Sequence, residues 1–98
     1  MNYRKTIFKQ IKHFVRFKRG ALAYNDCVDV FHMMVCVRLC QQCLDSLSRF
    51  DKISADEYNH IYELIDKMSD QAFNVSIKIR SETWSLLNDI FIREEESH

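Results

Sequence analysis

The sequence predicts an all-α fold in a single small domain. Its 98 residues contain no proline and one glycine, Gly20. Because the tight turns of β-proteins depend on these two residues, their scarcity favours long helices. A composition of 47% hydrophobic and 29% charged residues is that of a folded chain. This length holds one hydrophobic core, so we expect residues 1–98 to form one helical domain.

The first expected helix covers residues 3–19, within a basic amphipathic segment, residues 1–20. Its apolar side chains recur at helical spacing and form one stripe: Ile7, Phe8, Ile11, Phe14 and Val15. Gly20 is the predicted C-cap, because glycine enters the left-handed conformation without a Cβ penalty.

The second expected helix covers residues 25–50 and starts near Asn25 or Asp26. The expected main apolar face consists of Val28, Phe31, Val35, Leu39, Cys43, Leu47 and Phe50. Further apolar residues occupy the other sides: Val30, Met33, Met34 and Val37. A helix that is apolar all round is buried in its domain or covered by a partner. A domain this small can hardly bury it fully, so the pattern predicts an interface, and a homodimer through helix 25–50 is one form it could take.

The third expected helix, residues 54–73, has the clearest start in the chain. Ser54 and Glu57 form a capping box, and Ile53 and Tyr58 are spaced as its hydrophobic staple.

A fourth short helix is expected over residues 82–92, before a frayed acidic tail at 93–98. Residues 74–80 alternate apolar and polar side chains, which is typical of a strand, but a lone strand has no partner. This segment is therefore either an extended connector or a continuation of the third helix.

Positive charge is concentrated at the N-terminus. Residues 1–25 carry seven basic residues and no acid, whereas residues 26–98 carry seven basic and fourteen acidic residues. Such a helix can contact a phosphate backbone or an acidic lipid surface, or can simply close the bundle with its cations in water. No helix-turn-helix signature accompanies it, so only weak non-specific nucleic-acid contact is expected. The candidate residues are Arg4, Lys5, Lys9, Lys12, Arg16, Lys18 and Arg19.

The first twenty residues lack the uninterrupted apolar segment that export requires, so a cytoplasmic location with reduced thiols is expected. The longest apolar stretch, residues 27–40, is interrupted by charge and falls short of a membrane span. No membrane span is therefore expected.

The cysteines offer a weak metal-binding pattern. The candidates share roughly one helical face: His32, Cys36, Cys40 and Cys43. One straight helix cannot place four ligands tetrahedrally around zinc, so others would come from Cys27 or His60. Cysteine is otherwise a small buried hydrophobe, and this interpretation is preferred. No metal or cofactor is expected, and a zinc- or redox-responsive switch is kept as a second alternative function.

Catalytic motifs are missing from the sequence. It has no glycine-rich phosphate loop, nucleophile elbow or His-Glu-x-x-His motif. Asp66 and Asp70 have helical i, i+4 spacing, but such acids commonly form a solvated face. We therefore expect a protein that is not an enzyme.

Four short segments follow one another in a recognisable order: Arg38-Leu39-Cys40-Gln41, Asp45-Ser46-Leu47-Ser48-Arg49, Ile53-Ser54-x-x-Glu57 through Tyr62 to Asp66, and Ser81-Glu82-Thr83-Trp84. Through these segments, residues 26–92 resemble the Hha/YmoA family of small enterobacterial regulators, which pair with the nucleoid-associated silencer H-NS or its paralogues. The basic residues 1–25 have no counterpart there.

The resemblance implies that Asp66 and Trp84 meet the H-NS-like partner, and Tyr62 and Asp70 complete the predicted partner-binding set. A desolvated aromatic residue beside one charge is typical of an interface anchor. The expected function is a non-enzymatic regulator that binds a bacterial nucleoid protein and so modulates transcription. The alternative is a phage, plasmid or bacteriocin-related inhibitor or immunity protein that blocks an enzyme or toxin.

Overall fold

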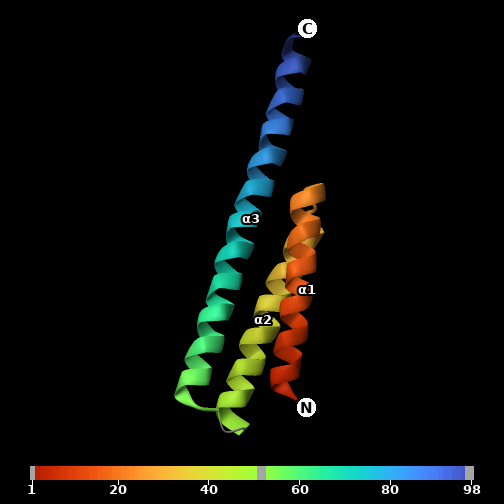
Figure 1. Ribbon diagram of the computed structural model, residues 1–98. Coiled ribbons are helices and arrows are strands. Elements are labelled where there is room, and N and C mark those ends of the chain that lie inside the picture. Colours follow the sequence, from red (N-terminus) through yellow and green to blue (C-terminus); the bar gives the residue numbers. More distant parts are fainter. Residues whose placement is uncertain (1, 51–52, 97–98) are drawn as a thin grey trace.

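The computed structural model describes residues 2–50 and 53–96, without the side chains at positions 83, 84, 87, 91 and 93–96. Its helices are α1 (Tyr3–Tyr24), α2 (Cys27–Phe50) and α3 (Ala55–Glu96). Figure 1 shows α1 and α2 as an antiparallel hairpin, with α3 packed against it and extending well past one end. The predicted all-α fold is confirmed.

Helix α1 is longer than predicted. Its N-cap is Asn2, whose side chain accepts a hydrogen bond from the Lys5 amide, and its C-cap is Asn25, which has the left-handed conformation (φ 51°). Asparagine tolerates this conformation better than most residues. Gly20 lies inside the helix, so its prediction as a C-cap was wrong. A Cβ at Gly20 would meet the carboxylate of Asp29, so the absent side chain leaves space for the Asp29 side chain of α2.

Helix α2 begins at Cys27, after Asp26, whose Oδ1 accepts a hydrogen bond from the Val28 amide at 2.8 Å. The predicted main face was largely wrong, because α1 and α3 both pack on the side centred on Met33, Cys40 and Leu47. The residues of that predicted face that are exposed instead are Val28, Phe31, Val35, Leu39 and Phe50.

Helix α3 joins the two helices predicted at 54–73 and 82–92. Residues 74–80 are helical, and so is the expected tail as far as Glu96. Val75 and Ile79 are buried because they continue the 3–4 spacing of Ile65, Met68 and Ala72. The helical spacing therefore prevails over the apparent alternation, while residues 97–98 of the tail lie outside the described residues.

The core is one cluster in which all three helices take part. It contains Ile7, Phe14, Ala21, Val30, Met33, Cys36, Val37, Cys40, Cys43, Leu44, Leu47, Ile65, Met68, Ala72, Val75 and Ile79. Cys40 donates a long hydrogen bond from its thiol to the Ile7 carbonyl, 3.9 Å away.

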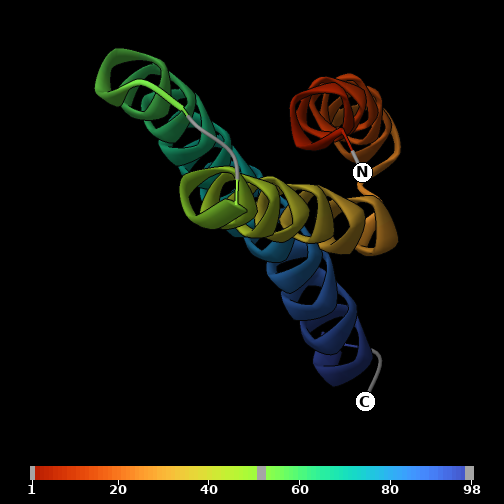
Figure 2. The same ribbon diagram turned by 90° about the horizontal axis from the view of Figure 1, so that it is seen from below.

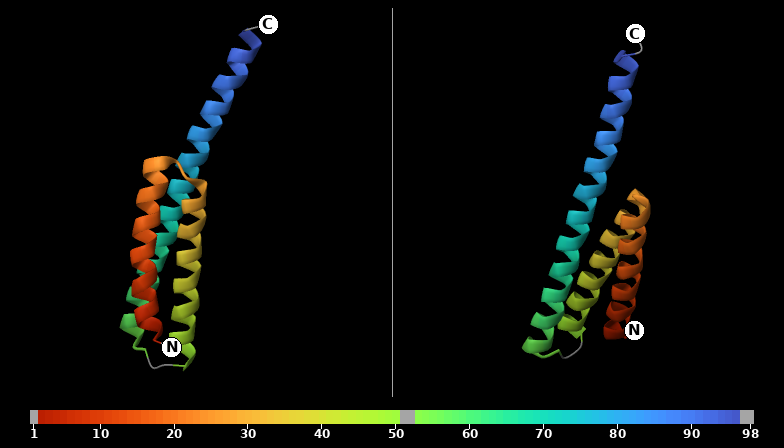
Figure 3. Two further views of the ribbon diagram at one scale, coloured as in Figure 1. Left: turned by 90° about the vertical axis from the view of Figure 1, so that its right-hand side faces the viewer. Right: turned by 45° about the horizontal axis from the view of Figure 1, so that its top comes forward.

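Two polar contacts fix the register of α3 against α1. Arg4 Nε donates to Glu57 Oε1 at 2.6 Å, and Lys18 Nζ donates to Gln71 Oε1 at 3.1 Å. Each contact joins two residues that are 53 positions apart in the sequence, so α1 and α3 run parallel. By the same offset, Tyr24 at the end of α1 lies level with Ile77 of α3. The hairpin therefore covers α3 only to about residue 80. Figure 3 shows that the rest of α3 extends beyond the hairpin. This segment, residues 81–96, is about 24 Å long at about 1.5 Å per residue.

The capping box at the start of α3 gives a first testable prediction. The amide of Glu57 donates to Ser54 Oγ at 3.2 Å, which confirms the Ser54 half of the predicted box. Ser54→Ala is expected to lower the free energy of unfolding by about 1 kcal/mol, measured by urea denaturation. Ser48→Ala on the exposed face of α2 is the control and should have little effect. Equal stabilities of the Ser54→Ala variant and the parent would contradict the cap.

By length and composition α2 could cross a membrane, because its most apolar 18-residue window has a mean hydropathy of 1.3. The core helix of a bundle can meet the same criterion. Here the buried side of α2 packs against α1 and α3.

Candidate protein-binding groove

A groove follows the seam between α2 and α3. Its first section, about 270 Å³, is lined by Gln41, Leu44, Asp45, Tyr58, Tyr62, Ile65, Asp66 and Ser69. The second section shares Gln41 and Ser69 with the first and adds Met34, Val37, Arg38, Ala72 and Phe73. The third shares Met34 with the second and is also lined by Cys27, Val30, Phe31, Ser76, Ile79 and Arg80. The sections therefore form one groove that follows α3 from Tyr58 to Arg80, about 33 Å at about 1.5 Å per residue.

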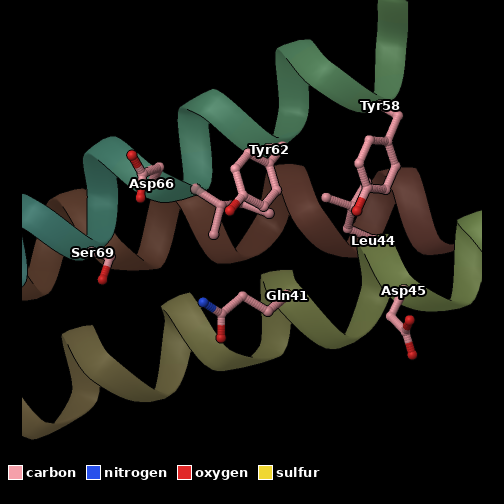
Figure 4. Close-up of a pocket in the computed structure, with 8 residues that line it drawn as sticks. Gln41, Leu44, Asp45, Tyr58, Tyr62, Asp66 and Ser69 are labelled. Carbon is pink, nitrogen blue, oxygen red and sulfur yellow. The ribbon is translucent and has the colours of Figure 1, made fainter. Parts of the chain in front are cut away.

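One end of the groove is acidic and aromatic. The rings of Tyr58 and Tyr62 are stacked, with centroids 6.3 Å apart and planes inclined by 18°. Figure 4 shows both rings across the seam, with Asp66 on the α3 side and Asp45 on the α2 side. Aromatic faces attract a cation, and carboxylates accept charge-assisted hydrogen bonds from guanidinium or ammonium groups. Asp45 Oδ2 already lies 3.5 Å from Nη2 of Arg49, so Asp66 and the two tyrosine rings are the part of this end that suits a lysine or arginine side chain of a partner.

The rest of the groove is mainly apolar and ends near a positive charge. Val30, Val37 and Ile79 are buried, whereas the apolar residues that remain exposed along the groove are Phe31, Met34 and Phe73. Arg38 lines the middle section and Arg80 the far end. A long apolar groove with opposite charges at its two ends suits an amphipathic helix.

The structure brings together only part of the predicted partner-binding set. Tyr62 and Asp66 both line the groove. Asp70 is exposed and is not among the lining residues of the three sections. Trp84 belongs to the projecting part of α3, about 27 Å further along the helix than Asp66, and its side chain lies outside the described part of the chain.

Sequence reasoning did not assign Tyr58, Phe73 or Phe31 to this site. The signal for the first two was their position on one helical face with Tyr62, at offsets of four and eleven residues. All three residues lie within the helix predicted at residues 54–73, so this signal was already present in the sequence.

The predicted nucleic-acid residues divide into two groups. Arg4 and Lys18 bind Glu57 and Gln71 of α3. The other five are exposed at 3–4 spacing on the face of α1 opposite its buried residues: Lys5, Lys9, Lys12, Arg16 and Arg19. These five residues form a basic stripe that takes no part in the core contacts of α1.

The metal candidates lie mostly in the core. Cys36, Cys40 and Cys43 are buried, and the ring of His32 stacks on Phe17 with centroids 4.7 Å apart. Burial raises the pKa of all three thiols, and burial together with Cys43 and Cys36 raises the pKa of Cys40 to about 12. Within residues 2–50 and 53–96 no three His, Cys, Asp or Glu side chains are grouped to hold a metal ion. These cysteines pack as small hydrophobes.

Thiol reactivity provides a second prediction. In the folded protein only the exposed Cys27 should react rapidly with a thiol reagent such as DTNB, and the three buried thiols should react on unfolding. Rapid reaction of all four thiols without denaturant would contradict this packing.

The raised pKa of Cys40 also predicts a pH dependence. A thiol that holds its proton more tightly when folded stabilises the fold fully below its unfolded pKa of about 9, and this contribution is lost as the pH rises toward 12. The free energy of unfolding should therefore fall above about pH 9 more steeply in the parent than in Cys40→Ala. Identical slopes in urea titrations of the two proteins would contradict this prediction.

Comparisons of the chain with family models, with curated proteins and with solved structures find no match. The similarity to the Hha/YmoA family therefore rests on the sequence motifs alone, and membership of that family is a proposal.

Proposed function

We propose that this protein is a non-enzymatic, protein-binding regulator that holds an amphipathic helix of its partner in the groove between α2 and α3. The observation that carries the proposal is the continuous groove, lined by exposed apolar side chains and acidic at one end. In helix-in-groove recognition, the bound helix inserts an apolar stripe of residues at i, i+3, i+4 and i+7. The groove between α2 and α3 has the length and the apolar lining to accept such a stripe.

The apolar side chains provide the affinity. Phe31, Met34 and Phe73 are each roughly half exposed or more. Full burial of such a side chain contributes about 1.5–3 kcal/mol, so completing their burial would give a few kcal/mol. Part of this gain is offset by the freedom lost on binding.

The charges set the direction in which the partner helix lies. A basic residue of the partner would contact Tyr58, Tyr62 and Asp66, and an acidic residue would lie near Arg80. Reversing the helix would bring like charges together at both ends, so the charges disfavour the opposite orientation.

The resemblance to the Hha/YmoA family suggests an H-NS-like protein as this partner. Asp66, the residue that the resemblance assigns to the interface, lines the acidic end of the groove. The proposed role is then modulation of a nucleoid protein and, through it, of transcription. An enzyme or toxin that offers a similar helix is the alternative occupant.

Titration calorimetry with an N-terminal fragment of H-NS tests this proposal. We expect the native chain to bind, Asp66→Lys to weaken binding by about 30-fold or more, and Asp70→Lys to bind nearly as the native chain does. These matched variants reverse the same charge one turn apart on α3, and both positions are exposed, so neither should unfold the protein. Equal weakening by both variants would contradict recognition in the groove, and no binding by the native chain would exclude this fragment as the partner.

A further inference from the structure

The projecting segment of α3, residues 81–96, carries large apolar side chains that are exposed in the described part of the chain. Leu86 and Ile90 are 61% and 53% exposed. They continue the stripe of Val75 and Ile79, which are buried where the hairpin covers them. The apolar stripe of α3 thus continues beyond the part of the helix that packs against α1 and α2.

A complementary row lies on α1. Phe8, Val15 and Leu22 are exposed and spaced seven residues apart. They lie one turn from Arg4 or Lys18, the residues that reach α3, so the row flanks the seam between α1 and α3. Figure 2 shows α1 and the first part of α3 on different sides of α2, and α1 and α3 contact each other less than either contacts α2. The side chains of Phe8, Val15 and Leu22 are therefore left exposed beside this sparser contact.

Charge identifies the helix that fits. Helix α1 has seven basic residues and no acid, whereas residues 81–96 have five acids and one base. Glu82 and Asp89, which lie within one turn of Leu86, are seven residues apart, as are Lys12 and Arg19 beside the α1 row. Pairing two projecting α3 segments would instead bring acid against acid.

We propose that two copies of the chain form a two-fold dimer in which the projecting segment of each α3, residues 81–96, packs along α1 of the other copy. The projecting segment is about 24 Å long, and the row from Phe8 to Leu22 spans about 21 Å, at about 1.5 Å per residue. A two-fold axis makes the contact reciprocal, so both segments are covered at once. The dimer uses neither the groove between α2 and α3 nor the homodimer surface expected on helix 25–50, and therefore stands independently of the proposed function.

Sedimentation equilibrium of the full chain tests the contact. A single chain has a mass of 11.8 kDa, and the native protein is expected to sediment at twice this mass. Leu86→Glu with Ile90→Glu should give a monomer, because it places charge in the apolar contact. Val35→Glu with Leu39→Glu, on the exposed side of α2, is the matched control and should remain dimeric. Circular dichroism should show unchanged helicity in both variants, since all four positions are exposed.

A charge exchange separates this dimer from other ways of associating. One variant carries Lys12→Glu and Arg19→Glu, and the other carries Glu82→Lys and Asp89→Lys. Each alone should be monomeric, because α1 and the incoming α3 then have like charges. An equal mixture should form mixed dimers, because both reciprocal contacts again pair opposite charges. A monomeric native protein at its highest attainable concentration, or a mixture that stays monomeric, would overturn the proposal.

Discussion

Replacing Phe14 with alanine is expected to lower the free energy of unfolding by about 3–5 kcal/mol. Phe14 is 2% exposed and belongs to the cluster that joins the three helices. Its loss removes apolar burial and leaves a cavity between rigid helices that cannot close it fully. Because a domain of this size is stable by about 5–15 kcal/mol, this single change should remove a large share of its stability.

Phe8→Ala is the matched control, because Phe8 is on the same helix but 66% exposed. Urea denaturation of the two variants as monomers, in the Leu86→Glu, Ile90→Glu background, keeps self-association out of the comparison. The Phe8 change should cost less than about 1 kcal/mol. A similar loss in both variants would show that α1 does not pack through the side that contains Phe14.

Phe73→Glu is expected to weaken binding of the partner helix by about 2 kcal/mol or more, which is about 30-fold. Phe73 is 62% exposed and lines the middle of the groove. A carboxylate at this position would have to be buried by the apolar face of the incoming helix, which is costly without a partner charge. Titration calorimetry with the H-NS fragment, or with a partner identified by the cross-linking described below, gives the affinity.

Phe50→Glu provides the comparison for this second variant. Phe50 is 78% exposed at the end of α2 and is not among the residues that line the groove sections. Its substitution introduces the same charge at a similarly exposed phenylalanine, so affinity should change little. Equal losses from the two substitutions would place the partner elsewhere on the molecule.

The fold class followed from the sequence because the scarcity of glycine and proline leaves few ways to build anything but long helices. The start of α3 was equally predictable, since the Ser54 cap depends on residues close in sequence. The end of α1 was not. Gly20 looks like a helix terminator, but its role is set by Asp29 of α2, a neighbour that local sequence does not identify.

The side of α2 that is buried could not be derived from its sequence, because apolar residues lie all round the helix. The choice depends on where α1 and α3 pack, and this leaves Phe31 and Val35 exposed instead of buried. For the same reason, the groove between α2 and α3 could not be predicted from the sequence. Tyr62 and Asp66 were found through the family resemblance, whereas Phe73 lines the groove because of how α3 packs against α2, which the sequence does not specify.

Site-specific photo-cross-linking in the native host tests whether the groove between α2 and α3 binds a helix of another protein. A photoreactive phenylalanine would replace Phe73 in the groove and, as control, Phe50. We expect a single main adduct from position 73, formed with an amphipathic segment bearing lysine or arginine, that disappears in the Asp66→Lys background and does not form from position 50. No adduct from position 73, or adducts that Asp66→Lys leaves unchanged, would contradict it.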